Sequence, residues 1–257
     1  MGFRDLRDKI GIESPKKLPI LTGAIFQKYL QQFQTGFLIY NNMKNTLEFL
    51  TELSEHNSKL WFDEHRKQYE NCKKAFVTEL ENVIEQMANI DPIFETLEAK
   101  KTIFRINRDI RFSKDKSPYK NNFGAWFTAP GTEKAGYYLH LQPGNKTFVG
   151  GGIYMPPSDM LKKIRQEIDY NKEELDQILD APAFKKLFPV VKGDQLTRPP
   201  KGYEESNPAI ELLKHKSLVV SVNISDQEII DGKLSQKTIE AFTVMKPFIQ
   251  FLNRAFD

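Results

Sequence analysis

Apolar residues recur at helical spacing in two series near the start of the regular pattern. Leucines at positions 47, 50 and 53 predict a first helix, with Thr46 as its expected N-cap. After a break at residues 56–58, a second apolar series runs from Leu60 to Met87 and predicts a long helix reaching Ala88. Asp91-Pro92 should end this region, because the residue before a proline disfavours the helical conformation.

Between residues 101 and 155, alternation of apolar and polar residues replaces the helical spacing. Four segments predict strands there: Lys101–Arg108, Asn122–Thr128, Tyr137–Gln142 and Thr147–Met155. A fifth strand, rich in valine, is predicted over Ser217–Ile224. Short connections between consecutive strands indicate an antiparallel meander.

Helical spacing returns after residue 156. We expect helices over Met160–Ile168, from near Asn171, over Ala183–Phe188, over Pro208–Lys214, and from Ser235 to about Asn253 with a kink or restart at Pro247. The pattern therefore predicts one α+β domain over residues 43–257. In it a central, mostly antiparallel sheet (a four-strand meander at about 101–155 plus a strand at about 217–224) packs with N- and C-terminal helices.

Residues 1–42 differ from the rest of the chain. They include Pro15, Pro19, Gly23 and Gly36 and show no long periodic pattern. We expect a loose N-terminal extension there, with Met43 as a candidate for the true start of the protein.

Composition narrows the class of protein. The chain has 257 residues, with 37 basic and 34 acidic side chains and a formal charge of +3, which argues against a broad polyanion binder. Its one cysteine, Cys72, excludes an internal disulfide framework and points to a cytoplasmic protein. No apolar run approaches the roughly 18 residues that span a bilayer, so no membrane association is predicted. The sequence contains no nucleotide-binding loop, zinc-protease or serine-hydrolase motif. Its four histidines are dispersed, so the sequence predicts no metal site. It assigns no cofactor and no oligomeric state.

The charge is concentrated in one window, Lys101 to Lys120. Seven basic residues against two acidic ones give it +5, so the remainder of the chain is net −2. Guanidinium and ammonium groups suit phosphate or carboxylate binding. The candidate ligand-binding residues are Arg105, Asn107, Arg108, Arg111, Lys114, Lys116 and Lys120. The alternative, equally weighted, is a solvated edge in which Asp109 and Asp115 pair with neighbouring arginines.

A second group of candidates lies on the predicted sheet. Alternation puts Tyr138, His140 and Gln142 on one face of their strand, and a Gly-Gly-Gly run at 150–152 should leave open space beside them. His140 and Tyr138 are the candidate catalytic residues, because imidazole titrates near neutral pH. Two alternatives stay open: His140 as a hydrogen-bonded structural histidine, and the glycines as a bend against which a helix packs.

Several segments together resemble a known family. They are Trp61–Arg66, Arg105–Lys120, Tyr137–Gly144, Phe148–Gly152 and Arg198–Tyr203. Over about residues 43–257 the chain resembles the bacterial and fungal domain of unknown function 2461. The resemblance implies a compact cytosolic single-domain protein and supplies no catalytic residues. Gln142 departs from the Glu that we expect more often there, which weakens an acid–base role for this site.

Three functions are compatible with these residues. The leading hypothesis is a domain that binds or acts on an anionic small molecule, phosphorylated or nucleotide-like, through the Arg/Lys-rich motif. A nucleic-acid-binding module using the same residues is the less favoured alternative, and a protein-interaction module for an acidic partner is the third. The sequence does not decide whether the protein is an enzyme.

Overall fold

The computed structural model describes residues 42–256, so the predicted N-terminal extension lies, except for Asn42, outside the described residues. A helix over residues 42–55 comes first, followed by α3 (Lys59–Glu64) and α4 (Arg66–Ala88). Ser58 caps α3 by accepting a hydrogen bond from the Trp61 N–H at 3.3 Å. The long helix predicted to reach Ala88 is therefore divided at His65, whose backbone leaves the helical region.

Four strands form one antiparallel sheet. They are β1 (Phe123–Phe127), β2 (Gly136–Leu141), β3 (Thr147–Ile153) and β4 (Leu218–Ile224), and their spatial order follows the chain. The predicted α+β class and mostly antiparallel sheet are confirmed.

The predicted first strand, Lys101–Arg108, is wrong. A short 3-10 helix η1 (Pro92–Thr96) and a short helix α5 (Ala99–Thr102) come before β1, and the residues after α5 make isolated bridges only. The Phe104 N–H bonds to the Gly124 carbonyl at 2.9 Å, but by Arg108 the chain pairs with its own return segment at Pro118. Because proline has no N–H to donate, this pairing cannot grow into a ladder. The alternating pattern thus marks an edge segment that leaves the sheet.

The remaining helices follow the sheet strands. They are α6 (Ser158–Tyr170), α7 (Lys172–Asp180), α8 (Pro182–Leu187), α9 (Ile210–Leu213), α10 (Asp226–Ile230) and α11 (Leu234–Arg254). Helix α11 continues through Pro247, so the predicted restart does not occur. Among the described residues, none of these helices is both long enough and apolar enough to cross a membrane.

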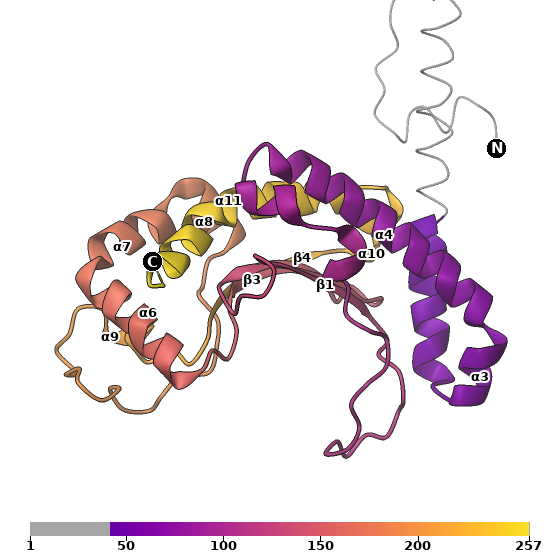
Figure 1. Cartoon of the computed structure of the whole chain (residues 1–257), viewed down its shortest axis with the longest axis horizontal. Coiled ribbons are helices and arrows are strands. Elements are labelled where there is room, and N and C mark those ends of the chain that lie inside the picture. Colours follow the sequence, from indigo (N-terminus) through magenta and orange to yellow (C-terminus); the bar gives the residue numbers. More distant parts are fainter. Residues whose placement is uncertain (1–41, 257) are drawn as a thin grey trace, which may run out of the picture.

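Within residues 42–256, helices cover one face of the sheet and leave the other open. Figure 1 shows α4 and α11 along one face, α6 to α9 gathered at one end, and the segment before β1 projecting on the opposite side. The core between the layers is aromatic: Phe242 of α11 lies 4.8 Å from Tyr137 and 5.3 Å from Phe127, measured between ring centroids. Burial of these rings anchors the sheet and fixes which face stays uncovered.

Candidate functional site

The uncovered face of the sheet carries rings from three neighbouring strands. The register puts Trp126 of β1 opposite Tyr138 of β2, and His140 of β2 opposite Phe148 of β3. The His140 and Phe148 rings are stacked, with centroids 4.8 Å apart, and Tyr138 lies 5.6 Å from Phe148. Tyr137, one residue away, is fully buried against the helices. The predicted division of this strand into two faces is confirmed.

The glycines of β3 serve both of the interpretations that the sequence left open. Gly150 lies opposite Tyr138 on the uncovered face, and a Cβ there would lie 2.7 Å from the Val220 carbonyl oxygen. Gly151 faces the other way, where a Cβ would lie 2.3 Å from Met245 Sδ of α11. One glycine therefore keeps the floor of the open face free of side chains, and the next lets the helix pack closely.

A groove of about 930 Å³ lies above this floor, and we call it the sheet-face groove. Its walls include the rings of Phe104, Trp126, Tyr138, His140, Phe148 and Tyr154. Glu133 and Lys134 are the acidic and basic side chains in its lining. A concave, mostly apolar site with few polar groups is typical of small-molecule sites.

Tyr154 and Met155 form the rim of the sheet-face groove beyond β3, which we call the lip; it is strained and apolar. Tyr154 and Met155 are 71% and 70% exposed, although both are large hydrophobic residues. Met155 has a φ of +46°, in the left-handed region that side chains other than glycine rarely adopt. Its N–H donates to Ser217 Oγ at 2.8 Å, which holds this conformation. Local strain of this kind is frequent at ligand sites, so we include these two residues in the candidate site.

His140 is hydrogen-bonded through both ring nitrogens. Nε2 lies 2.8 Å from Gln142 Oε1, and Nδ1 lies 2.9 Å from the Tyr138 hydroxyl. Gln142 is oriented in turn, because its amide nitrogen donates to Asn121 Oδ1 at 3.3 Å. Since Gln142 Oε1 only accepts, the proton of the neutral imidazole is assigned to Nε2, and Tyr138 donates to Nδ1.

Burial sets the protonation of this pair. Desolvation lowers the pKa of His140 and raises the pKa of Tyr138 to about 12. His140 is therefore neutral at pH 7, and transfer of the Tyr138 proton to it is strongly uphill. The geometry matches the structural-histidine alternative: a fixed donor–acceptor pair that orients a neighbour. A catalytic role for either residue stays a prediction.

Two arginines of the basic loop, residues 105–120, form ion pairs within the loop. Arg108 pairs with Asp115 and also donates to the Ser117 carbonyl at 3.2 Å. Hydrogen bonds from Ser117 and from Arg108 lower the pKa of Asp115 to about 2. Arg111 forms a two-pronged pair with Asp109, with Nε at 3.0 Å and Nη2 at 2.6 Å. Both acids thus pair with arginines, as the solvated-edge alternative expects.

The other candidate residues of the basic loop differ in whether their side chains form hydrogen bonds or ion pairs. The Lys116 ammonium donates to the Ile110 carbonyl at 3.0 Å. Within residues 42–256, the exposed side chains of Lys114 and Arg105 form no hydrogen bond or ion pair. Asn107 is exposed and its backbone bridges to Tyr119.

Lys120 connects the basic loop to the sheet-face groove. Its ammonium donates to the Arg105 carbonyl at 2.9 Å and lies 5.4 Å from the ring centroid of Phe104, a residue of the groove wall. Tyr138 and His140 line the groove, whereas none of the seven basic-loop candidates does. The predicted residues therefore form two adjacent sets that meet at Phe104, not one pocket.

Sequence reasoning missed most of the groove. Tyr154 and Met155 stand at the end of a predicted strand, directly before two prolines. Two large apolar side chains at the point where the chain leaves the sheet are a sequence signal for an exposed apolar surface. Trp126 was on a correctly predicted strand, but its face could be assigned only with the register to Tyr138. Lys192 does not line the groove but bridges to Val219, which does, and it comes from a segment without a regular sequence pattern.

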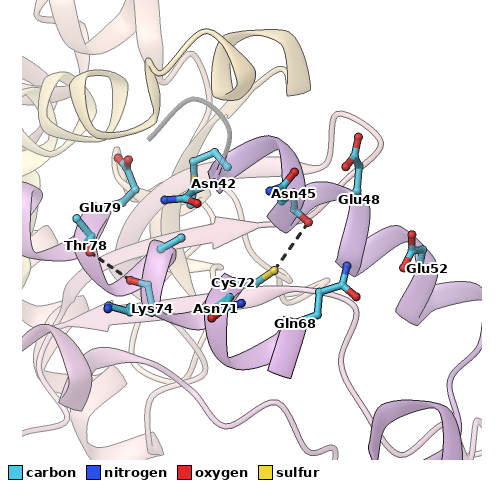
Figure 2. A pocket seen from close by; sticks show the side chains of 12 residues that line it. Asn42, Asn45, Glu48, Glu52, Gln68, Asn71, Cys72, Lys74, Thr78 and Glu79 are labelled. Atoms are coloured by element: carbon cyan, nitrogen blue, oxygen red, sulfur yellow. Dashed lines mark hydrogen bonds between the residues drawn. The ribbon is translucent and has the colours of Figure 1, made fainter. Parts of the chain in front are cut away.

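A second cavity, of about 410 Å³, lies between the helix over residues 42–55 and α4 (Figure 2). Amide side chains and the carboxylates of Glu48, Glu52 and Glu79 line it, against the one cation of Lys74. Cys72 donates weakly from its wall to the Asn45 carbonyl at 3.8 Å. Excess negative charge makes this cavity a poor host for an anion. Across the described part of the chain, no three His, Cys, Asp or Glu side chains are grouped as metal ligands.

Comparison with known proteins gave one result. No curated protein and no solved structure matches the chain. A family model described as "Conserved hypothetical protein (DUF2461)" matches residues 45–251, which include the four strands, the basic loop and every residue of the sheet-face groove. The chain therefore belongs to the DUF2461 family of conserved hypothetical proteins.

Proposed function

We propose that the protein binds a small organic anion with a planar ring, phosphorylated or nucleotide-like, in the sheet-face groove. One observation carries the proposal: a groove of about 930 Å³ whose walls are aromatic and whose floor is glycine. Rings from the walls offer faces and edges to a planar ligand, and a floor without side chains lets that ligand approach the backbone.

The basic loop supports the anionic character of the ligand. Six basic residues against two acidic ones give residues 105–120 a net charge of +4, although the whole chain has only +3. Internal pairing of Arg108 and Arg111 lowers their value as direct contacts, but the excess charge remains. A local positive field beside an apolar groove attracts anions and raises their association rate.

Tyr138 and His140 serve as orienting groups in this proposal. Their hydrogen bond fixes the hydroxyl and the ring at the groove wall, and a fixed hydroxyl can accept a hydrogen bond from a ligand. Binding, not acid–base catalysis, is the activity that the geometry supports best.

Ligand binding can be followed through Trp126, because the chain has only two tryptophans. Trp61→Phe leaves Trp126 as the sole indole, inside the groove. The probes are the four common nucleoside 5′-monophosphates and flavin mononucleotide, with inorganic phosphate as the anion without a ring. We expect saturable quenching by at least one ring phosphate and none by inorganic phosphate. If no ring phosphate changes the fluorescence or the melting temperature, the proposal is wrong.

A matched pair of tyrosine variants separates groove binding from surface effects. Tyr154→Ala removes a ring of the groove lip and should weaken binding about tenfold, because an aromatic contact is lost. Tyr170→Ala removes a similarly exposed ring on α6, outside the groove, and should leave binding unchanged. Equal effects of the two variants would contradict the placement of the ligand.

Nucleic-acid binding stays the second candidate, because of one residue. Phe112 at the tip of the basic loop is 96% exposed and lies 5.9 Å from the Arg111 guanidinium. An exposed ring beside cations suits stacking on an unpaired base. Binding of single-stranded oligonucleotides that falls steeply with salt and is lost in Phe112→Ala would favour this function.

A further inference from the structure

Lys192 lies at the β4 edge of the sheet-face groove, opposite the edge that the basic loop follows. Its backbone pairs with Val219 of β4 in both directions, at 2.7 Å and 3.2 Å. Bridge partners point to the same side of a sheet, and Val219 lines the groove. The backbone bridge therefore directs the exposed Lys192 side chain to the uncovered face of the sheet.

The Lys192 ammonium has a hydroxyl for a partner and no carboxylate. Nζ donates to Ser221 Oγ at 2.7 Å, and Ser221 lines the groove. Other lysines of the fold are neutralised, such as Lys185 by Asp180 at 2.8 Å and Lys214 by Glu205 at 2.6 Å. Within residues 42–256, no such ion pair involves Lys192. An ammonium with spare N–H groups next to a hydroxyl that can donate its proton is suited to an anion.

We infer that Lys192 and Ser221 bind the anionic group of the ligand, at the β4 edge of the groove. The inference rests on the proposed function and adds the position of the charge. The basic loop then has a different role. None of the basic-loop candidates lines the groove, and the Lys120 ammonium already contacts a carbonyl and the Phe104 ring, so the loop acts through its field while Lys192 makes the contact.

This placement also defines the ligand class. Trp126 is on β1 and Ser221 is on β4, three strand spacings apart, which corresponds to about 14 Å. A ligand that contacts both must separate its ring from its anionic group by a spacer, as ribose does in a nucleotide. A ring that carries its carboxylate directly cannot reach both ends.

The test compares phosphorylated and dephosphorylated probes on the full chain. Affinities of each nucleoside 5′-monophosphate and its nucleoside are measured by Trp126 fluorescence and by calorimetry. In Lys192→Ala, we expect monophosphate affinity to fall about tenfold or more, because a charge-assisted hydrogen bond is lost, with nucleoside affinity unchanged. Lys192→Arg should restore most of it. Lys162→Ala, an exposed lysine of α6 without a partner in the described region, is the matched control.

The outcomes separate this inference from the proposed function. If Lys192→Ala lowers monophosphate and nucleoside affinity equally, or lowers neither, the inference is wrong while groove binding stands. If Lys120→Ala abolishes the preference for the monophosphate and Lys192→Ala does not, the charge lies at the basic loop and the inference is again overturned. If no probe binds the unmodified protein, both are wrong.

Discussion

Tyr137 shows how much one hydroxyl contributes inside the core. Its ring packs against Phe242, and its O–H donates to Asp91 Oδ2 at 2.6 Å. Burial, and then the Asp91 carboxylate, raise the pKa of Tyr137, so the phenol stays protonated and remains a donor. Asp91 also caps η1 by accepting from the Ile93 N–H at 3.2 Å. One side-chain pair thus joins the sheet to the segment after α4.

Tyr137→Phe should lower the free energy of unfolding by about 1–3 kcal/mol. The substitution keeps the ring but leaves one buried carboxylate oxygen of Asp91 without its donor. Urea denaturation followed by circular dichroism measures the change. Tyr170→Phe, at an 80% exposed tyrosine, should stay within about 0.5 kcal/mol of the unmodified protein. A Tyr137→Phe value inside that same range would mean that Asp91 does not need the hydroxyl.

Gln142 gives His140 Nε2 an uncharged hydrogen-bond partner. A neutral amide accepts from Nε2, so burial dominates and the pKa of His140 is lowered. In Gln142→Glu a carboxylate would face the same nitrogen and favour the imidazolium, so the pKa of His140 should rise. Titration of the histidine Cε1–H resonances by NMR measures this directly. An unchanged His140 resonance profile in the variant would contradict the assigned contact.

The same substitution should change the pH dependence of stability. With a lowered pKa, His140 binds a proton more readily in the unfolded chain, so its contribution to stability is lost as pH falls below about 6.5. With a pKa raised above 6.5 in Gln142→Glu, the contribution is present below 6.5 and is lost as pH rises through the new pKa. Melting temperatures at pH 5.5 and 7.5 should therefore shift in opposite directions relative to the unmodified protein.

At the scale of elements, the basic loop is an ordered segment held by its own acids. Asp115 accepts from the Ser117 N–H at 2.9 Å, from the Ser117 hydroxyl at 2.7 Å and from Arg108. Asn57, in the turn before α3, fixes the loop's return by bonding Tyr119 in both directions, at 3.0 Å and 3.1 Å. These contacts preorganise the loop without a core of its own.

Asp115→Ala should make the basic loop open locally while the fold persists. Loss of three hydrogen bonds to one carboxylate frees the loop tip, where Phe112 is a fully exposed chymotrypsin site. Cleavage after Phe112, followed by mass spectrometry, should speed up severalfold with the melting temperature nearly constant. Asp109→Ala is the matched control: it also loses three hydrogen bonds, but all of them come from Arg111, two residues away, and none joins the two sides of the loop, so the increase should be clearly smaller. Equal cleavage rates for both variants would contradict the conclusion that Asp115 contributes most to holding the loop in place.

The elements that sequence predicted correctly are those whose pattern reflects burial. Strands β1, β3 and β4 lie within their predicted ranges, and β2 begins one residue before its range, because alternation of buried and exposed residues follows the two faces of a sheet that is covered on one side. The segment after α5 alternates as well, but its partner is partly its own return at Pro118, which no local pattern reveals. Likewise Lys192 reaches the groove only through a bridge between residues 27 positions apart, Lys192 and Val219.

At the scale of the whole molecule, stability depends on how closely α11 approaches the sheet. Helix α11 contacts β2, β3 and β4 and also packs beside α4, so it joins both parts of the helical layer to the sheet. Gly151 lies at this junction, where a Cβ would be 2.3 Å from Met245 Sδ and 2.7 Å from the Gly136 carbonyl oxygen. The methionine can move, but the carbonyl belongs to the neighbouring strand and cannot.

Gly151→Ala should therefore lower the free energy of unfolding by about 1–3 kcal/mol, because the layers must separate slightly to admit one methyl group. Urea denaturation measures the loss, and the cooperativity of the transition should be kept, since the same layers still form. Met245→Leu removes the sulfur nearest the added Cβ, so in that background the penalty of Gly151→Ala should shrink but not vanish, because the contact with the Gly136 carbonyl remains. A penalty that is unaffected by Met245→Leu would place the whole conflict in the backbone of β2 and β3. No penalty at all would show that α11 does not need the close approach that Gly151 provides.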